Sequence, residues 1–390
     1  MEKIMKQTIT ESVFYIGVDD KTLDLFESQY EIPNGISYNS YVIMDEKITV
    51  MDTVDARKTE EWIANLEAVL GDKKPSYLVI SHMEPDHASN IQFLMEKYPE
   101  MKLVGNAKTF TMIPQFFTVD ITDKTVVVKE GDTLNLGKHI LQFFMAPMVH
   151  WPEVMVTYEQ TEKILFSADG FGKFGALDAD EAWTCEARRY YFNIVGKYGL
   201  QVQALLKKAA TLDIQMICPL HGPILKEDLG YYIGKYDIWS KYEPEDEGVF
   251  IAYASIHGNT AKAAKKMAEI LEAKGAKRVA IADLSRDDIA EAVEDAFRHS
   301  ALVLACATYD NGMFPCMEDF LAHLKAKNFQ KRTVGLIENG SWGPAAAKNM
   351  RAVLEQMKEI EICEPVVTIK SVMKEDNIAK MEELAEAVLR

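Results

Sequence analysis

Residues 81–90 read SHMEPDHASN and directly follow SYLVI, residues 76–80, an apolar run typical of a buried strand. Two carboxylates and two imidazoles stand within six positions of this stretch: His82, Glu84, Asp86 and His87. Charges of one sign held so close repel each other and need a neutralising cation. The stretch therefore predicts a metal site at the end of a strand. The choice between zinc and iron separates a hydrolase from a redox enzyme.

Three more candidate ligands lie just beyond other predicted strands. His150 closes LQFFMAPMVH, Asp169 follows KILFSA, and His221 follows MICPL. Loops at the ends of strands often carry the residues of a site, positioned by the rigid scaffold below them. We therefore expect these side chains to join the cluster at 82–87. A lone histidine such as His139 is more often a hydrogen-bonded residue of the core or the surface, and we do not assign it to the site.

The composition disfavours several classes of protein. The chain has 390 residues, 48% of them hydrophobic, which is enough for two domains with packed cores. A net charge of −17 disfavours binding to nucleic acid or to an anionic membrane. No apolar run approaches the roughly 18 residues of a membrane helix, and MEKIMKQTIT at the start is unlike a signal peptide. The five cysteines form no CxxC pair, so we expect reduced thiols in a cytoplasmic protein.

The chain changes character near residue 242. YEPEDEGVFIAYAS, residues 242–255, passes from a charged segment into a continuous β-type run, and we place a linker at Glu243–Glu247. Domains are expected at 1–243 and 248–390. In the first of them, short β-type runs outnumber the helical segments and indicate a mixed sheet: 40–44, 47–51, 76–80, 102–105, 125–128, 153–158 and 163–167.

The second predicted domain alternates strictly between strands and helices. Five strands and five helices in this order indicate a doubly wound, five-stranded parallel sheet. The strands are expected at 249–255, 279–284, 301–307, 333–338 and 366–370, and the helices at about 260–274, 287–299, 316–326, 344–359 and 374–389.

The first loop of this domain has the composition of an anion site. In AYASIHGNTAKAAKKMAEIL, residues 252–271, hydroxyls, a glycine and free backbone N–H groups stand at a helix N-terminus, where a phosphate binds. The chain has neither a Walker motif nor GxGxxG, which disfavours a nucleoside triphosphate or a dinucleotide. The loops ATYDNGMFP and ENGSWGP should complete the site at the carboxyl edge of the sheet. For the first loop alone, ordinary helix capping is the simpler alternative.

These three loops together resemble those of a flavodoxin, which holds flavin mononucleotide (FMN) between them. The resemblance implies that the loop at 255–260 holds the phosphate and that the other two loops border the ring system. The implied FMN contacts are Ser255, Ile256, His257, Gly258, Asn259, Thr260, Thr308, Tyr309, Asp310, Asn311, Gly312, Asn339, Gly340, Ser341 and Trp342. His257 departs from the pattern, because a flavodoxin usually has a hydroxyl residue there.

The cluster at 82–87 resembles the His-x-His-x-Asp-His signature of the metallo-β-lactamase superfamily, with Glu84 in place of the second histidine. The downstream candidates, His150, Asp169 and His221, fall in that superfamily's ligand order. The implied fold of this domain is an αββα sandwich. Replacing one histidine by glutamate leaves four imidazoles and three carboxylates, a harder ligand set that suits iron better than zinc.

Such a domain joined to a flavodoxin domain resembles the flavodiiron proteins over essentially the whole chain. The segments that carry the resemblance are HWPEVMVTY (150–158), LFSADGFG (165–172), EARRYYFNI (186–194), PLHGPIL (219–225) and TYDNGMFP. The resemblance implies two irons: His82, Glu84 and His150 would bind one, Asp86, His87 and His221 the other, and Asp169 would bridge them. Gly170, after the bridging residue, departs from the family's common alanine.

The reaction that this resemblance implies is reduction of dioxygen to water, of nitric oxide to nitrous oxide, or of both. Water formation takes four electrons, two from a diferrous pair and two from a reduced flavin. The resemblance also implies a head-to-tail homodimer, or a dimer of such dimers, and an external electron donor such as rubredoxin. We assign no catalytic acid, base or nucleophile, and we interpret Tyr190 and Tyr191 as core residues.

Two alternatives stay open at this point. A zinc enzyme of the same superfamily, with the flavodoxin domain as a passenger, would hydrolyse an ester or an amide. A flavin electron carrier with a purely structural metal would consume neither gas. Glu84 is the residue that discriminates, because the preference for iron rests chiefly on it.

Overall fold

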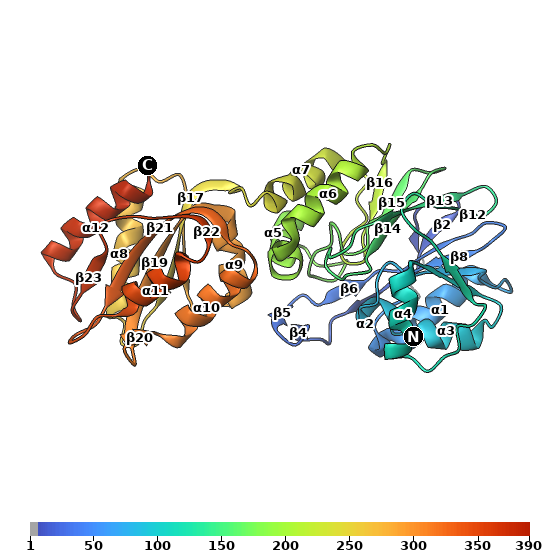
Figure 1. Ribbon diagram of the computed structural model, residues 1–390, viewed down its shortest axis with the longest axis horizontal. Coiled ribbons are helices and arrows are strands. Elements are labelled where there is room, and N and C mark those ends of the chain that lie inside the picture. Colours follow the sequence, from blue (N-terminus) through green and yellow to red (C-terminus); the bar gives the residue numbers. More distant parts are fainter. Residues whose placement is uncertain (1–6) are drawn as a thin grey trace. The chain divides into compact units, whose positions relative to one another are not determined.

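Three large sheets organise residues 7–390, the part of the chain that the computed structural model describes (Figure 1). Two sheets belong to an N-terminal unit, made of the described residues up to Tyr190 together with Leu200–Tyr236. The third belongs to a C-terminal unit, made of Tyr191–Gly199 and Asp237–Arg390. The chain is therefore a two-domain α/β protein, as predicted. No pattern in the sequence indicates that Tyr191–Gly199 joins the second unit, and the domain boundaries at 243 and 248 stay a prediction.

The first sheet of the N-terminal unit is mixed. Its last four strands run parallel, and each parallel pair needs a crossover connection. The first crossover contains helix α1 (Thr59–Leu70), the second contains helices α2 (Pro85–Ala88) and α3 (Ile91–Lys97), and the third contains helix α4 (Ala107–Phe116). In spatial order the strands are β1 (Gln7–Thr8), β2 (Val13–Tyr15), β7 (Tyr41–Ile43), β8 (Thr49–Met51), β9 (Tyr77–Val79), β10 (Lys102–Gly105) and β11 (Thr125–Val127).

The second sheet is antiparallel except for its last pair, which is parallel. Its strands are β12 (Thr133–Asn135), β13 (Ile140–Met145), β14 (Met155–Glu159), β15 (Ile164–Phe166) and β16 (Met216–Cys218). Buried side chains from both sheets form one core, among them Val79 and Val104 from the first sheet and Phe143 and Phe166 from the second. This shared core makes the unit the predicted sandwich. All seven predicted strands are present, with ends shifted by up to two residues.

The remaining elements of this part of the chain are helices and two short hairpin-like sheets. The helices are α1 (Thr59–Leu70), α2 (Pro85–Ala88), α3 (Ile91–Lys97), α4 (Ala107–Phe116), α5 (Trp183–Tyr190), α6 (Gly199–Ala209) and α7 (Leu229–Ser240), with short helical turns at Ala56–Lys58, Tyr191–Val195 and Gly196–Tyr198. The short sheets pair β3 (Val18–Asp20) with β6 (Ile36–Tyr38) and β4 (Leu25–Phe26) with β5 (Tyr30–Glu31).

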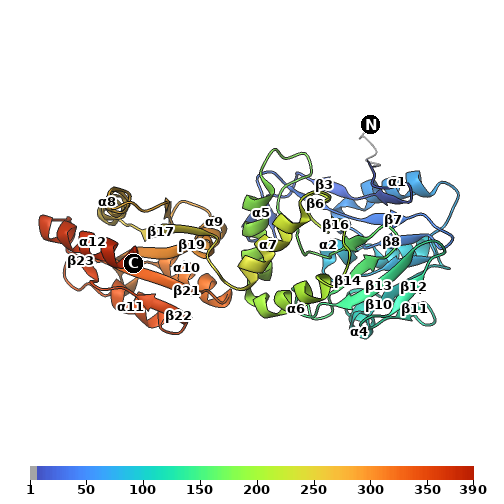
Figure 2. The same cartoon turned by 90° about the horizontal axis from the view of Figure 1, so that it is seen from above.

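The C-terminal unit is a doubly wound parallel sheet with helices on both faces. Figure 2 shows α8 and α11 on opposite sides of the sheet, and α12 packs beside α8. The strands are β18 (Val279–Asp283), β17 (Asp246–Ala254), β19 (His299–Tyr309), β21 (Gln330–Asn339), β22 (Lys358–Ile362) and β23 (Val367–Ile369), and β20 (Gly312–Met313) pairs with β19. The helices are α8 (Asn259–Ala273), α9 (Ile289–Arg298), α10 (Pro315–Ala326), α11 (Ala346–Leu354) and α12 (Glu375–Val388).

One predicted helix of this unit is wrong in its second half. The helix expected at 344–359 ends at Leu354, and KEIEI, residues 358–362, forms β22. This segment alternates charged and β-branched residues, the period of a strand, and it pairs with the start of β21. The end of β21 pairs with β23, so two short strands share the fifth position of the sheet.

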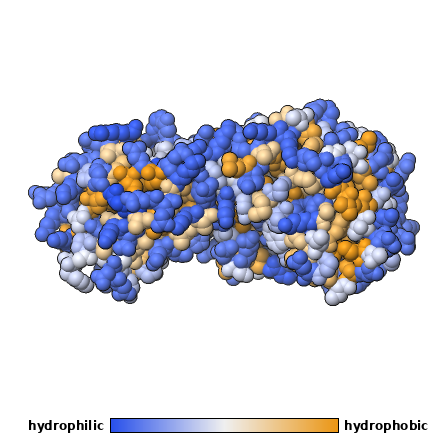
Figure 3. Space-filling view, viewed as in Figure 1, coloured by the Kyte–Doolittle hydropathy of each residue, from blue (hydrophilic) through white to orange (hydrophobic). Residues whose placement is uncertain are grey.

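The surface agrees with the high net charge of the chain. Hydrophilic side chains cover most of the face of each unit seen in Figure 3, and hydrophobic ones gather in small groups. Among the described residues, no helix is both long and apolar enough to cross a membrane.

Candidate metal centre and cofactor cavity

The seven predicted metal ligands approach one another at strand ends of the N-terminal unit. β9 belongs to the first sheet, and β13 to β16 belong to the second, so the ligands come from loops of both sheets. His82 and Glu84 follow β9, Asp86 and His87 lie on α2, His150 lies between β13 and β14, Asp169 follows β15, and His221 follows β16. Pro85 at the first turn of α2 fixes the step from the loop into the helix.

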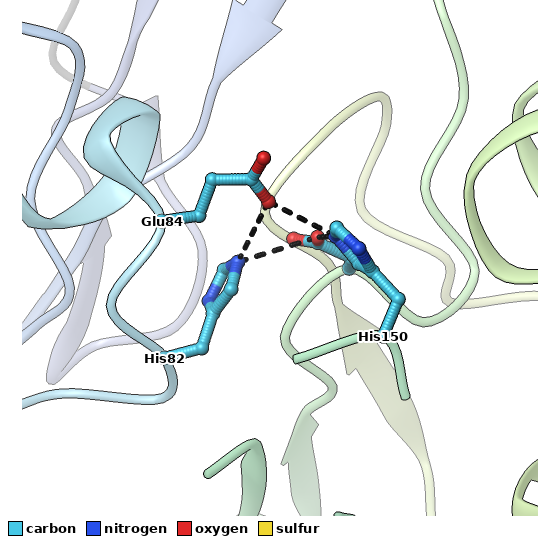
Figure 4. Close-up of side chains that lie close together, drawn as sticks. His82, Glu84 and His150 are labelled. Carbon is cyan, nitrogen blue, oxygen red and sulfur yellow. Dashed lines mark hydrogen bonds and ion pairs between the residues drawn. The ribbon is translucent and has the colours of Figure 1, made fainter. Parts of the chain in front are cut away.

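Four of these side chains form one group. The Nε2 atom of His150 lies 3.0 Å from Glu84 Oε2 and 3.0 Å from Asp169 Oδ2. The Nε2 atom of His82 lies 3.3 Å from the same oxygen of Asp169 and 3.6 Å from Glu84 Oε2. Figure 4 shows the imidazole of His82 and the carboxylate of Glu84, from one loop, and the imidazole of His150, from another, pointing toward a common centre. The ligand atoms of this group all lie within 4.8 Å of one another.

The other side chains gather around a second centre. The Nε2 atom of His87 lies 3.2 Å from Asp86 Oδ2 and 3.0 Å from His221 Nε2. Asp86 Oδ2 is also 3.3 Å from His221 Nε2. Asp169 faces this group with its other oxygen, because Oδ1 lies 3.6 Å from His87 Nε2. Each carboxylate oxygen of Asp169 thus faces a different group.

Several buried atoms of the cluster lack a hydrogen bond. These atoms are both ring nitrogens of His82, both carboxylate oxygens of Asp86, Nδ1 of His87 and Oδ1 of Asp169. None of them makes a hydrogen bond to any residue that the structure describes. Buried polar atoms without a partner are rare, because each loses its bonds to water. His221 is oriented differently, since its Nδ1 donates to the Ser37 carbonyl at 2.7 Å and leaves Nε2 free to bind a metal. This donor set fits a pair of cations.

The electrostatics of the cluster lead to the same conclusion. Burial opposes a charge on His82, but the carboxylates of Asp169 and Glu84 outweigh it and raise the pKa of His82 well above its usual range. Burial also opposes a charge on His150, yet the same two carboxylates raise its pKa to about 10. In turn, His87 and His221 outweigh the effect of burial and hold the pKa of Asp86 far below its usual value. The carboxylates attract positive charge, which metal ions supply in place of protons.

Two buried carboxylates that the sequence analysis missed support the ligand loop. Asp52 accepts a hydrogen bond from the backbone N–H of Ser81 and another from its hydroxyl, both at 2.6 Å. Glu153 Oε1 accepts the N–H of Met83 at 2.8 Å. These bonds fix the backbone on either side of His82. The available signals were weak: Asp52 directly follows the predicted strand at 47–51, and Glu153 stands three residues after His150.

A polar cavity of about 210 Å³ reaches this cluster at Glu84 and Asp86. The charged side chains of Glu27, Asp55 and Arg57 line it, together with the apolar side chains of Leu23, Leu25 and Phe26. Burial at this cavity and the Glu84 carboxylate raise the pKa of Glu27 to about 7. The cavity therefore offers ionisable groups beside the predicted ligands.

Tyr190 lies beside the cluster, next to His221. Its side chain is buried, and its ring centroid is 5.5 Å from that of His221. The hydroxyl makes no hydrogen bond to any residue that the structure describes. Burial and the nearby Asp169 carboxylate raise the pKa of this phenol well above its usual value, so it stays protonated.

The predicted cofactor site is a cavity of about 540 Å³ in the C-terminal unit. Its volume lies within the range of about 300–1,000 Å³ that is typical of small-molecule sites. All predicted FMN contacts line it except Ser255, Gly258 and Gly312. The sequence analysis missed Ala307, Gly343 and Ser371, which also line it.

The loops of this cavity are built largely from backbone and small polar groups. Gly258 begins α8 with a φ of +85°, a conformation that favours glycine, and its N–H donates to Ser255 Oγ at 3.1 Å. Thr308 Oγ1 accepts the N–H groups of Ala345 and Ala346 and so ties two of the loops together. Ser371 donates its N–H to Asn339 Oδ1 at 2.9 Å. Ser255, Gly258 and Gly312 belong to these loops, because Gly258 bonds to Ser255 and Gly312 pairs with Tyr309, and their contact with FMN stays a prediction.

Large side chains at the rim of this cavity are exposed. Trp342 is 96% exposed, and Tyr309 is 46% exposed. The N-terminus of α8 presents free backbone N–H groups, the arrangement that binds a phosphate. The cavity fits a flavin nucleotide, with an anion site at one end and aromatic side chains available for stacking.

Two family profiles match these two units. The profile described as ODP family beta lactamase matches residues 36–222, and that described as flavodoxin matches residues 251–383. Fold and site together define a flavoprotein with a β-lactamase-like metal domain.

Individual relatives match most or all of the chain. The anaerobic nitric oxide reductase flavorubredoxin of Aliivibrio fischeri is 30% identical over a match that covers 89% of this chain and 72% of that protein. The rubredoxin oxygen:oxidoreductase of Desulfovibrio gigas has 27% identity and a TM-score of 0.92, with 99% of this chain and 98% of that chain covered. The flavodiiron protein of Giardia intestinalis has 25% identity and a TM-score of 0.89, with 100% of this chain and 98% of that chain covered. The chain belongs to the flavodiiron protein family.

Proposed function

We propose that this protein is a flavodiiron oxidoreductase, which reduces dioxygen to water, nitric oxide to nitrous oxide, or both. The observation that carries the proposal is the pair of ligand groups that share Asp169, in a chain that also has a flavodoxin unit. The relative from Aliivibrio fischeri is named for nitric oxide, and that from Desulfovibrio gigas for oxygen. Both gases are therefore candidate substrates.

The proposal assigns the seven side chains to two irons. His82, Glu84 and His150 would hold one iron, Asp86, His87 and His221 would hold the other, and Asp169 would serve both. The short distances within each group and the orientation of the two Asp169 oxygens support this assignment. Three carboxylates make the set harder than an all-histidine site, which favours iron over zinc.

When bound, the irons and FMN supply the electrons, four for converting dioxygen and four protons to two waters, or two for converting two nitric oxide molecules and two protons to nitrous oxide and water. The chain's own residues position the ligand atoms. Asp52 and Glu153 hold the loop that carries His82 and Glu84. The polar cavity beside Glu84 is suited to water and protons, because Glu27, Asp55 and Arg57 line it.

The proposed FMN site is the cavity of the C-terminal unit. The phosphate binds at the N-terminus of α8, in the loop from Ser255 to Thr260, and the ring lies between the loops that carry Tyr309 and Trp342. The free N–H groups of α8 and the cavity volume support this placement. An external donor reduces the flavin, and the name of the Desulfovibrio gigas relative supports a rubredoxin in this role. The head-to-tail homodimer stays part of the proposal, and sedimentation equilibrium tests it.

Metal and gas analysis on one preparation tests the proposed function. The protein is reconstituted without oxygen in the presence of FMN and equal amounts of iron and zinc, and metals and flavin are counted per chain. We expect two irons and one FMN, and consumption of at least one of the two gases by the reduced protein. Bound zinc, hydrolysis of model esters and no gas consumption would establish the hydrolase instead. Bound iron without gas consumption would leave only an electron carrier.

A further inference from the structure

We infer that a small apolar cavity behind the metal ligands is a holding site for the diatomic gas, dioxygen or nitric oxide, before it reaches the irons. This inference rests on the proposed function. The cavity has a volume of about 30 Å³ and lies within the N-terminal unit, between helix α6 and the second sheet. It is separate from the polar cavity that reaches Glu84 and Asp86, because the two share no lining residue.

The walls of the cavity are hydrocarbon. Leu205, Leu206 and Ala209 of α6 face Phe144, Val156 and Leu165 of the sheet. Lys208 also lines it, but its ammonium group donates to the Met145 carbonyl at 2.8 Å and to Glu130 at 2.9 Å. The charge of Lys208 is therefore satisfied elsewhere, and its methylene stem is the part available to the cavity.

The polar groups at the wall already have partners. The hydroxyl of Ser167 donates to the Gly170 carbonyl at 2.6 Å, and that of Tyr236 accepts the N–H of Phe171 at 2.6 Å. A buried water needs two to four polar partners, so water is poorly held here. The volume is roughly two to three times the about 10–15 Å³ that one water needs, which leaves room for a diatomic molecule. Apolar gas is favoured over water in such a space because its transfer out of water is favourable.

Chain neighbours of two predicted ligands form part of the cavity wall. Val149, at its wall, precedes His150 in the chain, and Gly170 and Phe171, also at its wall, follow Asp169. Val149 and Gly170 are thus the direct chain neighbours of His150 and Asp169. The two cavities therefore serve different molecules: the polar cavity suits water and protons, and the apolar cavity suits the gas.

A packing defect is the competing explanation, because protein cores contain a few small voids. Both explanations allow a noble gas to enter, but only the holding site predicts that filling the cavity slows the reaction. Ala209→Leu places extra methyl groups in the cavity from α6. Ala204→Leu makes the same change at an exposed position of the same helix and is the matched control.

Two measurements test the inference. Crystals of the wild-type protein under xenon pressure should show xenon in this cavity, and A209L crystals should not. In stopped-flow experiments with the fully reduced holoenzyme at low gas concentration, A209L should react roughly three- to tenfold more slowly than wild type and A204L. Iron content, FMN content and the rate of flavin reduction should be equal in all three.

The failures of the inference and of the proposed function are distinguishable. An empty cavity under xenon overturns the inference, and so does an A209L protein that reacts as fast as A204L, while gas consumption by wild type still upholds the function. A wild-type holoenzyme that consumes neither gas overturns the function and the holding role with it, whatever the xenon shows. Should A209L fail to fold, Val202→Leu fills the same cavity from about two turns earlier in α6 and decides the kinetic test.

Discussion

The metal centre and the cofactor cavity are built by opposite means. The centre consists of seven ionisable side chains, and those of His82, His87 and His221 are completely buried. The cavity consists of three loops with small polar groups, a helix N-terminus and exposed aromatic side chains such as Trp342. In the first site, the chemistry lies in particular side chains. In the second site, many of the groups that would bind the cofactor are backbone groups, and their positions do not depend on one particular side chain.

This difference predicts how each site responds to substitution. A ligand at the centre touches several others, so removing one leaves buried charges without a partner, which is costly. A contact at the cavity is one of many, and water can replace it. Single substitutions should therefore have large effects on iron and small effects on FMN.

The largest effect is expected for Glu84→Gln, which removes a carboxylate from the group around His82 and His150. We expect loss of one iron and at least about a hundredfold fall in gas consumption, because even residues that only support metal ligands change metal affinity by about 10–100-fold. FMN content should not change. Elemental analysis and oxygen- and nitric-oxide-electrode traces measure these effects. Glu181→Gln alters a partly buried, ion-paired glutamate outside the ligand cluster and should keep both irons. Full iron in E84Q would refute the assignment.

Removing the metals should make the stability of the protein depend on pH, because the ionisable groups of the centre then titrate. In the metal-free protein the pKa of His150 is about 10, above its unfolded value of about 6.5, so protonation stabilises the fold below pH 6.5 and that gain is lost as the pH rises through 10. The pKa of Asp86 is lowered, so the ionised Asp86 stabilises the fold above its unfolded pKa of about 4, and this stabilisation is lost as the pH falls. Stability should peak between about pH 5 and 6.5.

Urea unfolding of the N-terminal unit measures this dependence. Chelated protein should lose roughly 2–4 kcal/mol of unfolding free energy between pH 6.5 and 10, an order-of-magnitude figure because the groups titrate together. Iron-loaded protein should lose much less, since the metals hold the imidazoles in their neutral form. Equal losses with and without metal would mean that the cluster does not set the pH response.

Glu153 gives a smaller and more selective test of the centre, because it touches the backbone of Met83 and not a metal. Glu153→Ala removes the acceptor and should weaken iron binding by about 10–100-fold. Glu153→Gln keeps an acceptor oxygen and should weaken it less than tenfold. Competition with a chelator measures both affinities. If the two variants were equally weak, the charge of Glu153, and not its hydrogen bond, would be the property that matters.

Residue type made the metal cluster predictable, while tertiary contacts decided what supports it. Two carboxylates and two imidazoles in six residues stand out in any sequence, and the structure brings them together with His150, Asp169 and His221. The acceptor role of Asp52 depends on Ser81, 29 positions away, and no local pattern shows such a contact. His139 illustrates the opposite case. It lies buried, 2.7 Å from Asp45 and 3.1 Å from Ser12, in a hydrogen-bonded cluster apart from the predicted ligands, as expected of a lone histidine.

The fold shows the same limit. Alternating strands and helices predicted the doubly wound parallel sheet of the C-terminal unit, because each element buries a long apolar face of its own. The pairing of KEIEI with β21 was missed, since a five-residue alternation directly after a helix is too short to mark a strand. The loop after β23 was missed at the cofactor cavity for a related reason: Ser371 contributes through its pairing with Asn339, which only the folded chain reveals.

Within the cofactor cavity, Thr308 should be the most sensitive side chain, because its oxygen accepts two backbone N–H groups at the start of α11. Thr308→Val keeps the shape and removes the acceptor, at a cost of about 1 kcal/mol, so FMN affinity should fall about fivefold to tenfold. Thr308→Ser restores the hydroxyl and should bind almost as wild type. Quenching of flavin fluorescence measures both. A wild-type affinity in T308V would show that the loops do not depend on this tie.

The smallest effect is expected for Trp342→Ala. The side chain is 96% exposed, so its removal should change the unfolding free energy by less than about 0.5 kcal/mol. Its proposed contact with the flavin ring is a stacking contact, worth about 0.5–1.5 kcal/mol, so FMN affinity should fall only about threefold to tenfold. Val372→Ala, a 60% exposed neighbour of Ser371, should leave FMN affinity unchanged. Complete loss of FMN in W342A would mean that a single side chain carries this site as well, and the contrast with the metal centre would fail.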